Sequence, residues 1–259
     1  MSAWDALAAE LDAWAAVPGG ARLWWRDDDL VRPGPRIGRL LALSDRFAAP
    51  VLLAVVPQAM DPALAGLGGR FAWFGQHGWA HADNSLPPAP GARRKKVELG
   101  GSCDPDAAAA DLARGWSRLQ EHLQADRLLP VMVPPWNRID PAILARLPAL
   151  GYAGWSGFGA RRPDGPLPAV NVHVDPIDWR GTGGFAGEGA AIGQLVAHLQ
   201  AKRSGAADPE EPTGLMTHHA VHDAATWAFV AALLEAVAAH PHAAWVAPPA
   251  LFPVPAEAA

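Results

Sequence analysis

The chain has 259 residues, of which 50% are hydrophobic and 18% are charged, a composition that supplies a sizeable core and argues against disorder. The formal net charge of −5 gives no support for nucleic-acid binding, and one cysteine excludes an internal disulfide. Without an apolar run of 18 residues or a secretory signal pattern, we expect a cytoplasmic protein with no membrane span.

Helical and strand-like segments alternate along the chain. Residues 1–20 are expected to hold an amphipathic helix that ends at a Pro-Gly-Gly turn. Further helices are expected over residues 37–47, 104–124, 140–151, 190–202 and 223–240. Strands are expected over residues 23–25, 51–56, 71–74, 128–133, 152–156, 170–174, 215–217 and 243–246. Residues 247–259 are rich in Ala and Pro and are expected to form a loosely ordered tail.

This alternation predicts an α/β fold with a parallel sheet and helices outside it, either a barrel or an open doubly wound sheet. No linker divides the chain, so residues 1–259 are expected to form a single domain. No glycine-rich loop follows the first strand, which makes a nucleotide-binding Rossmann domain a weak interpretation.

Four polar clusters follow apolar strands: Asp27–Asp29, His77–His81, Asp175–Asp178 and His218–His222. Each has an ordinary explanation, such as a solvated turn or a buried structural histidine. In a parallel α/β fold, however, all four would meet at the carboxyl edge of the strands, where such folds place active sites. That convergence favours a functional site over four unrelated features.

Two of these clusters carry groups suited to a metal ion. His77 and His81 are four residues apart, a spacing that allows both imidazoles to bind one metal. Gly78 stands where a zinc protease of this spacing has Glu, so that class is disfavoured. The adjacent carboxylates Asp27–Asp29 would repel one another unless they share a cation or a proton. His218–His222 could form a second metal site.

A basic run, Arg93–Lys96, precedes the expected helix at residue 104. Such a run is usually a solvated loop. It could also border the site and attract an anionic substrate, because positive charge at a cleft raises the local concentration of anions.

Five elements of the sequence resemble the ordered signature of the polysaccharide deacetylases, the chitooligosaccharide-deacetylase-like carbohydrate esterases. In chain order they are Asp27-Asp28, His77 to His81, Pro134-Pro135-Trp136, Asp175-Pro-Ile-Asp178-Trp179 and Met216-Thr217-His218. The resemblance implies a distorted (β/α) barrel with about seven strands. It also implies a metal-dependent hydrolase that removes an acyl group, such as acetyl, from an N-acylated sugar or small saccharide.

The resemblance implies a role for each matching residue. It makes Asp27 the general base and His218 the general acid, with Asp178 holding or tuning His218. It assigns Asp28, His77 and His81 as the metal ligands. It assigns substrate contacts to Pro135, Trp136 and Trp179, with the Trp136 backbone N–H helping to stabilise the oxyanion. Zinc is favoured by this ligand set, which also accepts cobalt or nickel.

The sequence departs from the family pattern at three places. The family motif ends in a single His, where this chain adds His219 and His222 after His218. The family usually carries Arg before its Pro-Pro-aromatic turn, where this chain has Val133; Arg26 and Arg138 are the nearby arginines that could substitute. Asp29 replaces the usual Gly, so which two of the three aspartates act stays open. The alternatives to a sugar deacetylase are a hydrolase of a small non-sugar amide or ureide and a catalytically inactive carbohydrate-binding protein.

Overall fold

A curled, all-parallel sheet forms the centre of the molecule in the computed structural model, which describes residues 2–161 and 165–252. Its strands are β1 (Ala21–Leu30), β2 (Val51–Val55), β3 (Ala72–His77), β4 (Leu128–Val133), β5 (Gly154–Trp155), β6 (Thr213–Thr217) and β7 (Ala243–Trp245). The strand order is β5-β4-β3-β2-β1-β6, and β7 pairs with the first residues of β1. The predicted α/β class with a distorted (β/α) barrel is confirmed.

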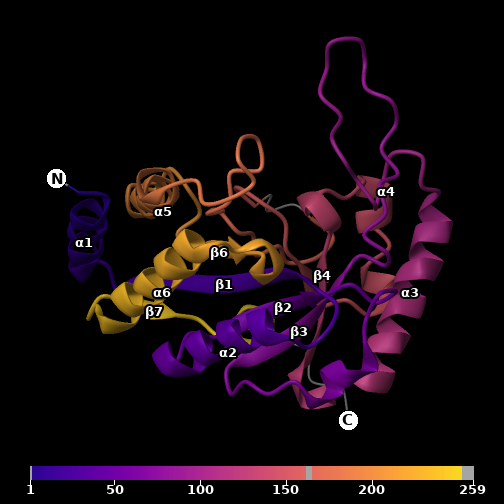
Figure 1. Ribbon diagram of the computed structural model, residues 1–259. Helices are drawn as coiled ribbons and strands as arrows, with labels where there is room; N and C mark the ends of the chain where they lie inside the picture. The colour runs from indigo at the N-terminus through magenta and orange to yellow at the C-terminus, as the bar shows by residue number, and fades with distance from the viewer. Residues whose placement is uncertain (1, 162–164, 253–259) are drawn as a thin grey trace.

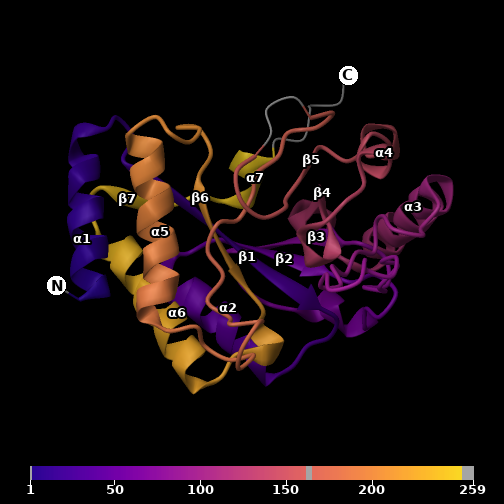
Figure 2. The ribbon, with the colours of Figure 1, turned by 90° about the horizontal axis from the view of Figure 1, so that it is seen from above.

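Helices surround the sheet (Figure 1). They are α1 (Ala3–Ala13), α2 (Pro35–Phe47), α3 (Pro105–His122), α4 (Pro141–Leu144), α5 (Glu188–Arg203), α6 (Ala224–Ala239) and α7 (Pro248–Leu251). Figure 2 shows α1, α5 and α6 side by side, with α3 at the far end of the sheet. The predicted Asp-Pro helix starts are confirmed, because the Asp104 and Asp140 side chains accept hydrogen bonds from backbone N–H groups of the first turns of α3 and α4. No described helix is long and apolar enough to cross a membrane.

The two faces of β1 are buried in different apolar clusters. Trp25 packs into the large cluster between the sheet and its helices, whereas Trp24 belongs to a smaller cluster on the opposite, inner face. This opposition follows from the two-residue alternation of side chains along a strand. It decides where the aspartates that follow Trp25 point.

Three expected segments differ in the structure. The helix expected over residues 140–151 is reduced to α4, followed by a 3-10 turn at Pro148–Leu150. Residues 170–174 form isolated bridges, such as Phe158 with Val172 and Val174 with Leu215, rather than a strand. The beginning of the expected loose tail is folded: α7 occupies Pro248–Leu251, and Phe252 is fully buried with its ring 5.9 Å from that of Trp24. This aromatic contact offsets the weak local propensity of an Ala/Pro-rich segment. Residues 253–259 lie outside the described residues.

Gly214 allows β6 to approach the inner cluster closely. A Cβ atom there would lie 2.5 Å from Trp24 Nε1 and 2.6 Å from the Asn171 carbonyl oxygen. The Trp24 indole N–H donates to that same carbonyl at 2.9 Å. Any side chain at position 214 would therefore push apart a buried hydrogen bond.

We expect Gly214→Ala to lower the free energy of unfolding by about 1–3 kcal/mol through overpacking. The matched control is Gly193→Ala, because Gly193 lies exposed in α5 with open space around its Cβ position. That change should raise stability by about 0.5–1 kcal/mol through helix propensity. Urea denaturation of both variants measures the two changes in the free energy of unfolding. Equal changes in the two variants would contradict the close approach at Gly214.

Candidate active site

A cavity of about 680 Å³ opens at the carboxyl edge of the sheet. Each of the four polar clusters identified in the sequence contributes at least one lining residue. The lining comprises Asp28, Asp29, His77, His81, Lys96, Trp136, Asn137, Arg138, Phe158, Asp175, Trp179, Arg180, Met216 and His218. The parallel topology produces this convergence, because β1, β3, β4 and β6 all end on the same side.

Asp29, His77 and His81 form a group whose potential ligand atoms all lie within 4.8 Å of one another. Asp29 Oδ1 lies 3.1 Å from His77 Nε2 and 3.2 Å from His81 Nε2. Donor atoms of a tetrahedral zinc ion with bonds of about 2.0–2.1 Å are separated by roughly 3.3 Å. One carboxylate and two imidazoles therefore fit a divalent metal, with coordination positions left for other ligands.

Local structure orients both histidines. His77 Nδ1 donates to the Val133 carbonyl oxygen at 2.8 Å, so Nε2 of the neutral ring keeps its lone pair for a metal. After it the chain turns at Gly78, with φ of 56°, where a Cβ would strike Glu98 and Pro135. The buried Glu98 carboxylate accepts backbone N–H groups of residues 79–81 and thereby holds the turn that carries His81.

The charges of the group suit metal binding. Burial alone would raise the pKa of Asp29, but its hydrogen bond with His77 and the charges of the nearby histidines lower it well below its usual range. Burial and repulsion from His77 lower the pKa of His81. Burial acts to lower the pKa of His77 as well, yet the neighbouring aspartates outweigh it and raise that pKa.

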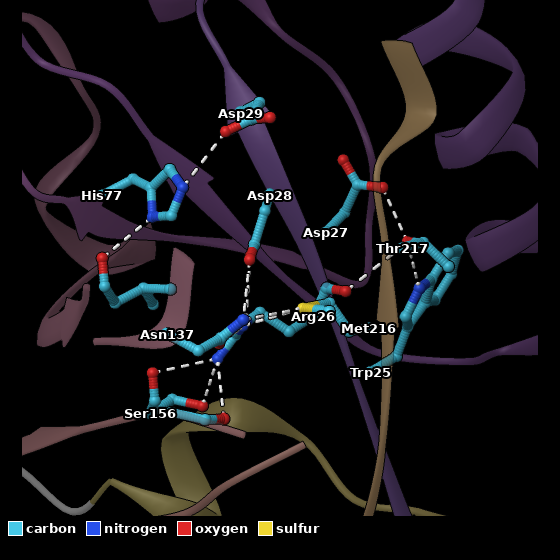
Figure 3. A network of polar contacts seen from close by, with 12 residues as sticks. Trp25, Arg26, Asp27, Asp28, Asp29, His77, Asn137, Ser156, Met216 and Thr217 are labelled. Atoms are coloured by element: carbon cyan, nitrogen blue, oxygen red, sulfur yellow. Dashed lines mark hydrogen bonds and ion pairs between the residues drawn. The ribbon is translucent and has the colours of Figure 1, made fainter. Parts of the chain in front are cut away.

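Asp28, expected to be a metal ligand, instead forms a buried ion pair with Arg26 (Figure 3). Arg26 Nε and Nη2 donate to the two carboxylate oxygens at 2.8 and 2.9 Å. Arg26 also donates to Ser156 and Asn137, which fixes the guanidinium. The group of potential metal ligands therefore includes Asp29 and not Asp28. Of the two arginines offered in place of the family's arginine, Arg26 pairs with an aspartate of the run, whereas Arg138 donates to the Lys96 backbone carbonyl. Arg26 and Asp28 are two residues apart and so lie on the same face of the strand.

Asp27, expected to be the general base, points to the opposite face of β1 and is fully buried. Its Oδ1 atom accepts from His219 Nδ1 at 2.5 Å. Its Oδ2 atom accepts from the Thr217 hydroxyl at 2.6 Å and from the His219 backbone N–H at 3.0 Å. Asp27 therefore anchors the residues on both sides of His218 and does not line the cavity.

His218 lines the cavity beside Asp175 and Trp179. The Trp179 ring meets the His218 ring edge-on at 4.9 Å, and its indole N–H donates to Asp175 Oδ2 at 2.7 Å. Burial raises the pKa of Asp175, although the charge of His218 opposes that shift. Asp178, expected to hold His218, instead accepts backbone N–H groups of residues 180–182 and closes a turn. Asp175 is the aspartate of this motif that shares the cavity with His218.

The expected substrate contacts divide into two kinds. Trp136 and Trp179 line the cavity, and the Trp136 ring lies 4.3 Å from that of His81. Pro135 is buried beneath Gly78 rather than in the lining. Trp136 adopts a left-handed backbone conformation with φ of 53°, which is uncommon for a bulky residue and marks a constrained turn at the cavity wall.

A second group of potential ligands, His173, His198 and Glu211, does not suit a metal. The two imidazole rings stack at 3.5 Å with planes 18° apart, so their in-plane lone pairs run side by side rather than converging. The Gly214 N–H donates to His173 Nδ1, which places the proton of the neutral ring on Nε2, facing Glu211. We interpret this group as a buried structural cluster.

We expect Arg26→Met to lower the free energy of unfolding by about 3–5 kcal/mol, because Asp28 would remain buried without its partner. Arg114→Met is the control, since it breaks an exposed ion pair with Asp111 and should cost no more than about 1 kcal/mol. Chemical denaturation measures both. If Arg26→Met lowered the free energy of unfolding no more than Arg114→Met does, the proposed anchoring of Asp28 by Arg26 would be contradicted.

The Asp27–His219 pair predicts a pH-dependent contribution to stability. Burial acts to lower the pKa of His219, but the Asp27 carboxylate outweighs it and raises that pKa above its usual value of 6.5. The resulting stabilisation is fully present below pH 6.5 and is lost as the pH rises through the raised pKa. The unfolding free energy of wild type minus that of His219→Gln should therefore shrink between pH 6 and pH 9. A constant difference would refute the charged pair.

The chain was compared with known proteins and structures. No protein-family model matches its sequence, and no curated protein matches it. Several solved structures are similar along most of their length, including the following three. A candidate polysaccharide deacetylase from Mycobacterium smegmatis has a TM-score of 0.59 and 18% identity, with 89% of this chain and 88% of that chain covered.

The other two structures are similar at lower identity. A CE4 esterase from Streptococcus mutans has a TM-score of 0.54 and 11% identity, covering 90% of this chain and 86% of its own. A peptidoglycan N-acetylglucosamine deacetylase, solved with an N-hydroxybenzamide compound, has a TM-score of 0.52 and 12% identity, covering 90% and 88%. The chain therefore has the fold of the polysaccharide deacetylases, and at the level of the fold the resemblance seen in its five motifs is confirmed.

Proposed function

We propose that this protein is a metal-dependent hydrolase that removes an acyl group, such as acetyl, from the nitrogen of an N-acylated saccharide. The observation that carries the proposal is one cavity in which a three-donor metal group stands beside an Arg-anchored carboxylate and a histidine. The metal group is Asp29, His77 and His81, the carboxylate is that of Asp28, and the histidine is His218. The shared fold supports the same reaction class.

The metal ligands in this proposal are Asp29, His77 and His81, with zinc favoured and cobalt or nickel accepted by the same donors. When bound there, a divalent ion lowers the pKa of a water molecule and polarises the acyl carbonyl. Asp28 takes the proton from that water. Each of its oxygens has a second lone pair beyond the hydrogen bond from Arg26, so the ion pair leaves it able to act as a base.

His218 lies at the cavity wall and gives a proton to the leaving nitrogen. The Asp27 anchor on Thr217 and His219 fixes the backbone on both sides of it, and Asp175 lines the same cavity. The Trp136 backbone N–H is assigned to the developing oxyanion. Trp136 and Trp179 offer apolar faces to the substrate.

The alternative of a catalytically inactive carbohydrate-binding protein drew its support from the missing arginine at Val133. Arg26 supplies a guanidinium to Asp28 from a different position, which removes that support. A small non-sugar amide or ureide would use the same groups. The exposed faces of Trp179 and Phe158 at the cavity favour the ring of a saccharide.

The test compares the three consecutive aspartates. Asp29→Ala should lose the bound metal, measured by elemental analysis of protein purified without a His tag. Asp28→Asn should keep the metal but lose about 10²–10⁴-fold in acetate release from N-acetylated oligosaccharides. Asp27→Asn should keep the metal and lose less turnover than Asp28→Asn, because it acts only through the position of His218.

Three outcomes would contradict the proposal. No metal in the wild type after incubation with zinc, cobalt or nickel would remove the metal-dependent reaction. Near wild-type turnover of Asp28→Asn would remove its role as base. A larger loss for Asp27→Asn than for Asp28→Asn, at equal stability, would return that role to Asp27.

A further inference from the structure

Three cationic side chains line the mouth of the candidate active site. They are Lys96, Arg138 and Arg180. They come from three separate segments: the long loop between β3 and α3 that rises from the molecule in Figure 1, the turn after β4, and the turn closed by Asp178. All three residues are exposed.

Two of these cations are held in place rather than free in solvent. Arg138 Nη1 donates to the Lys96 backbone carbonyl at 2.8 Å, which ties the turn after β4 to the long loop. The Lys96 ammonium lies 5.7 Å from the centre of the Trp136 ring, within the range of a cation–π contact. Trp136 itself lines the cavity, so the charge of Lys96 is kept at its wall.

Among the described residues, none of these three cations forms an ion pair with a carboxylate. Across residues 2–161 and 165–252, the ion pairs within 4.0 Å include none of the three cations. The acidic groups on the cavity floor are already engaged: Asp28 with Arg26, Asp29 with the two histidines, and Asp175 with the Trp179 indole. The whole chain has a net charge of −5, so a positive mouth runs against its overall charge.

We propose, building on the function proposed above, that the substrate is anionic: an N-acylated saccharide that also carries a carboxylate or phosphate group, which Lys96, Arg138 and Arg180 bind. Like charges gathered at one opening repel one another unless an anion joins them, and arginine forms paired hydrogen bonds with both anions. The exposed rings of Phe158 and Trp179 at the same opening accept the sugar face. The anion thus orients the substrate above the metal group.

The test measures binding of three acetylated sugars to the metal-loaded protein by calorimetry. N-acetylglucosamine is the neutral probe, N-acetylglucosamine 6-phosphate carries a phosphate, and N-acetylmuramic acid carries a carboxylate. At least one anionic sugar should bind about tenfold tighter than the neutral one at low salt, and this preference should weaken in 0.5 M salt. The anionic sugar that shows the preference identifies which of the two groups is recognised.

The variant Lys96→Gln/Arg138→Gln/Arg180→Gln should lose that preference and keep its affinity for N-acetylglucosamine. The matched control, Arg70→Gln/Arg93→Gln/Lys95→Gln, removes the same charge from exposed positions outside the cavity lining and should keep the preference. Equal affinities for neutral and anionic sugars in the wild type would overturn the inference, and so would an equal loss in both triple variants.

The binding experiment tests the anionic substrate separately from the proposed deacylation. If the anionic preference is found but neither the three sugars nor N-acetylated oligosaccharides release acetate, the deacylase function fails and the binding inference stands. If acetate is released and the neutral sugar binds as well as the anionic ones, the deacylase function stands and the inference fails.

Discussion

The buried ion pair between Arg26 and Asp28 is the interaction on which the site depends. Both residues lie on the inner face of β1, and two parallel hydrogen bonds join them. Burying two charges is costly, and the remaining donors of Arg26 offset that cost by binding Ser156 and Asn137. Since those partners follow β5 and β4, one guanidinium fixes the end of β1 relative to two other walls of the cavity. The rest of the site is arranged around that fixed carboxylate.

Three consecutive aspartates occupy three environments because of how β1 ends. Strand alternation sends Asp27 to the outer face and Asp28 to the inner face. The register between β1 and β2 then shifts between Asp27 and Leu30, and Asp29 takes a left-handed conformation with φ of 67° that turns it toward His77. Each carboxylate meets its own cationic or proton-donating partner, namely His219, Arg26 or the His77–His81 pair. The repulsion expected of adjacent carboxylates is thereby removed.

The resemblance to the polysaccharide deacetylases rests on the fold and on the order of the motifs, while individual positions have moved. In the proposed site the arginine beside a carboxylate is Arg26 of β1, and the two aspartates in the cavity lining are Asp28 and Asp29. The geometry of this chain's own groups carries the proposal: a carboxylate beside a guanidinium, and a carboxylate beside two imidazoles. A candidate site of this kind is argued from its groups and not from the fold alone.

The sequence by itself determined the alternating strands and helices, the α/β class, the Asp-Pro helix starts and the four polar clusters, three of which lie at strand ends in the structure. Each of these depends on local patterns of two to four residues, such as apolar periodicity and capping. Only the tertiary structure decided the partner of each aspartate, the choice of Asp175 over Asp178 beside His218, and the burial of Phe252. Those outcomes depend on a register shift, a turn and contacts between residues far apart in the chain. In particular, nothing local distinguishes Asp27, Asp28 and Asp29, whereas the sheet places a different partner before each of them.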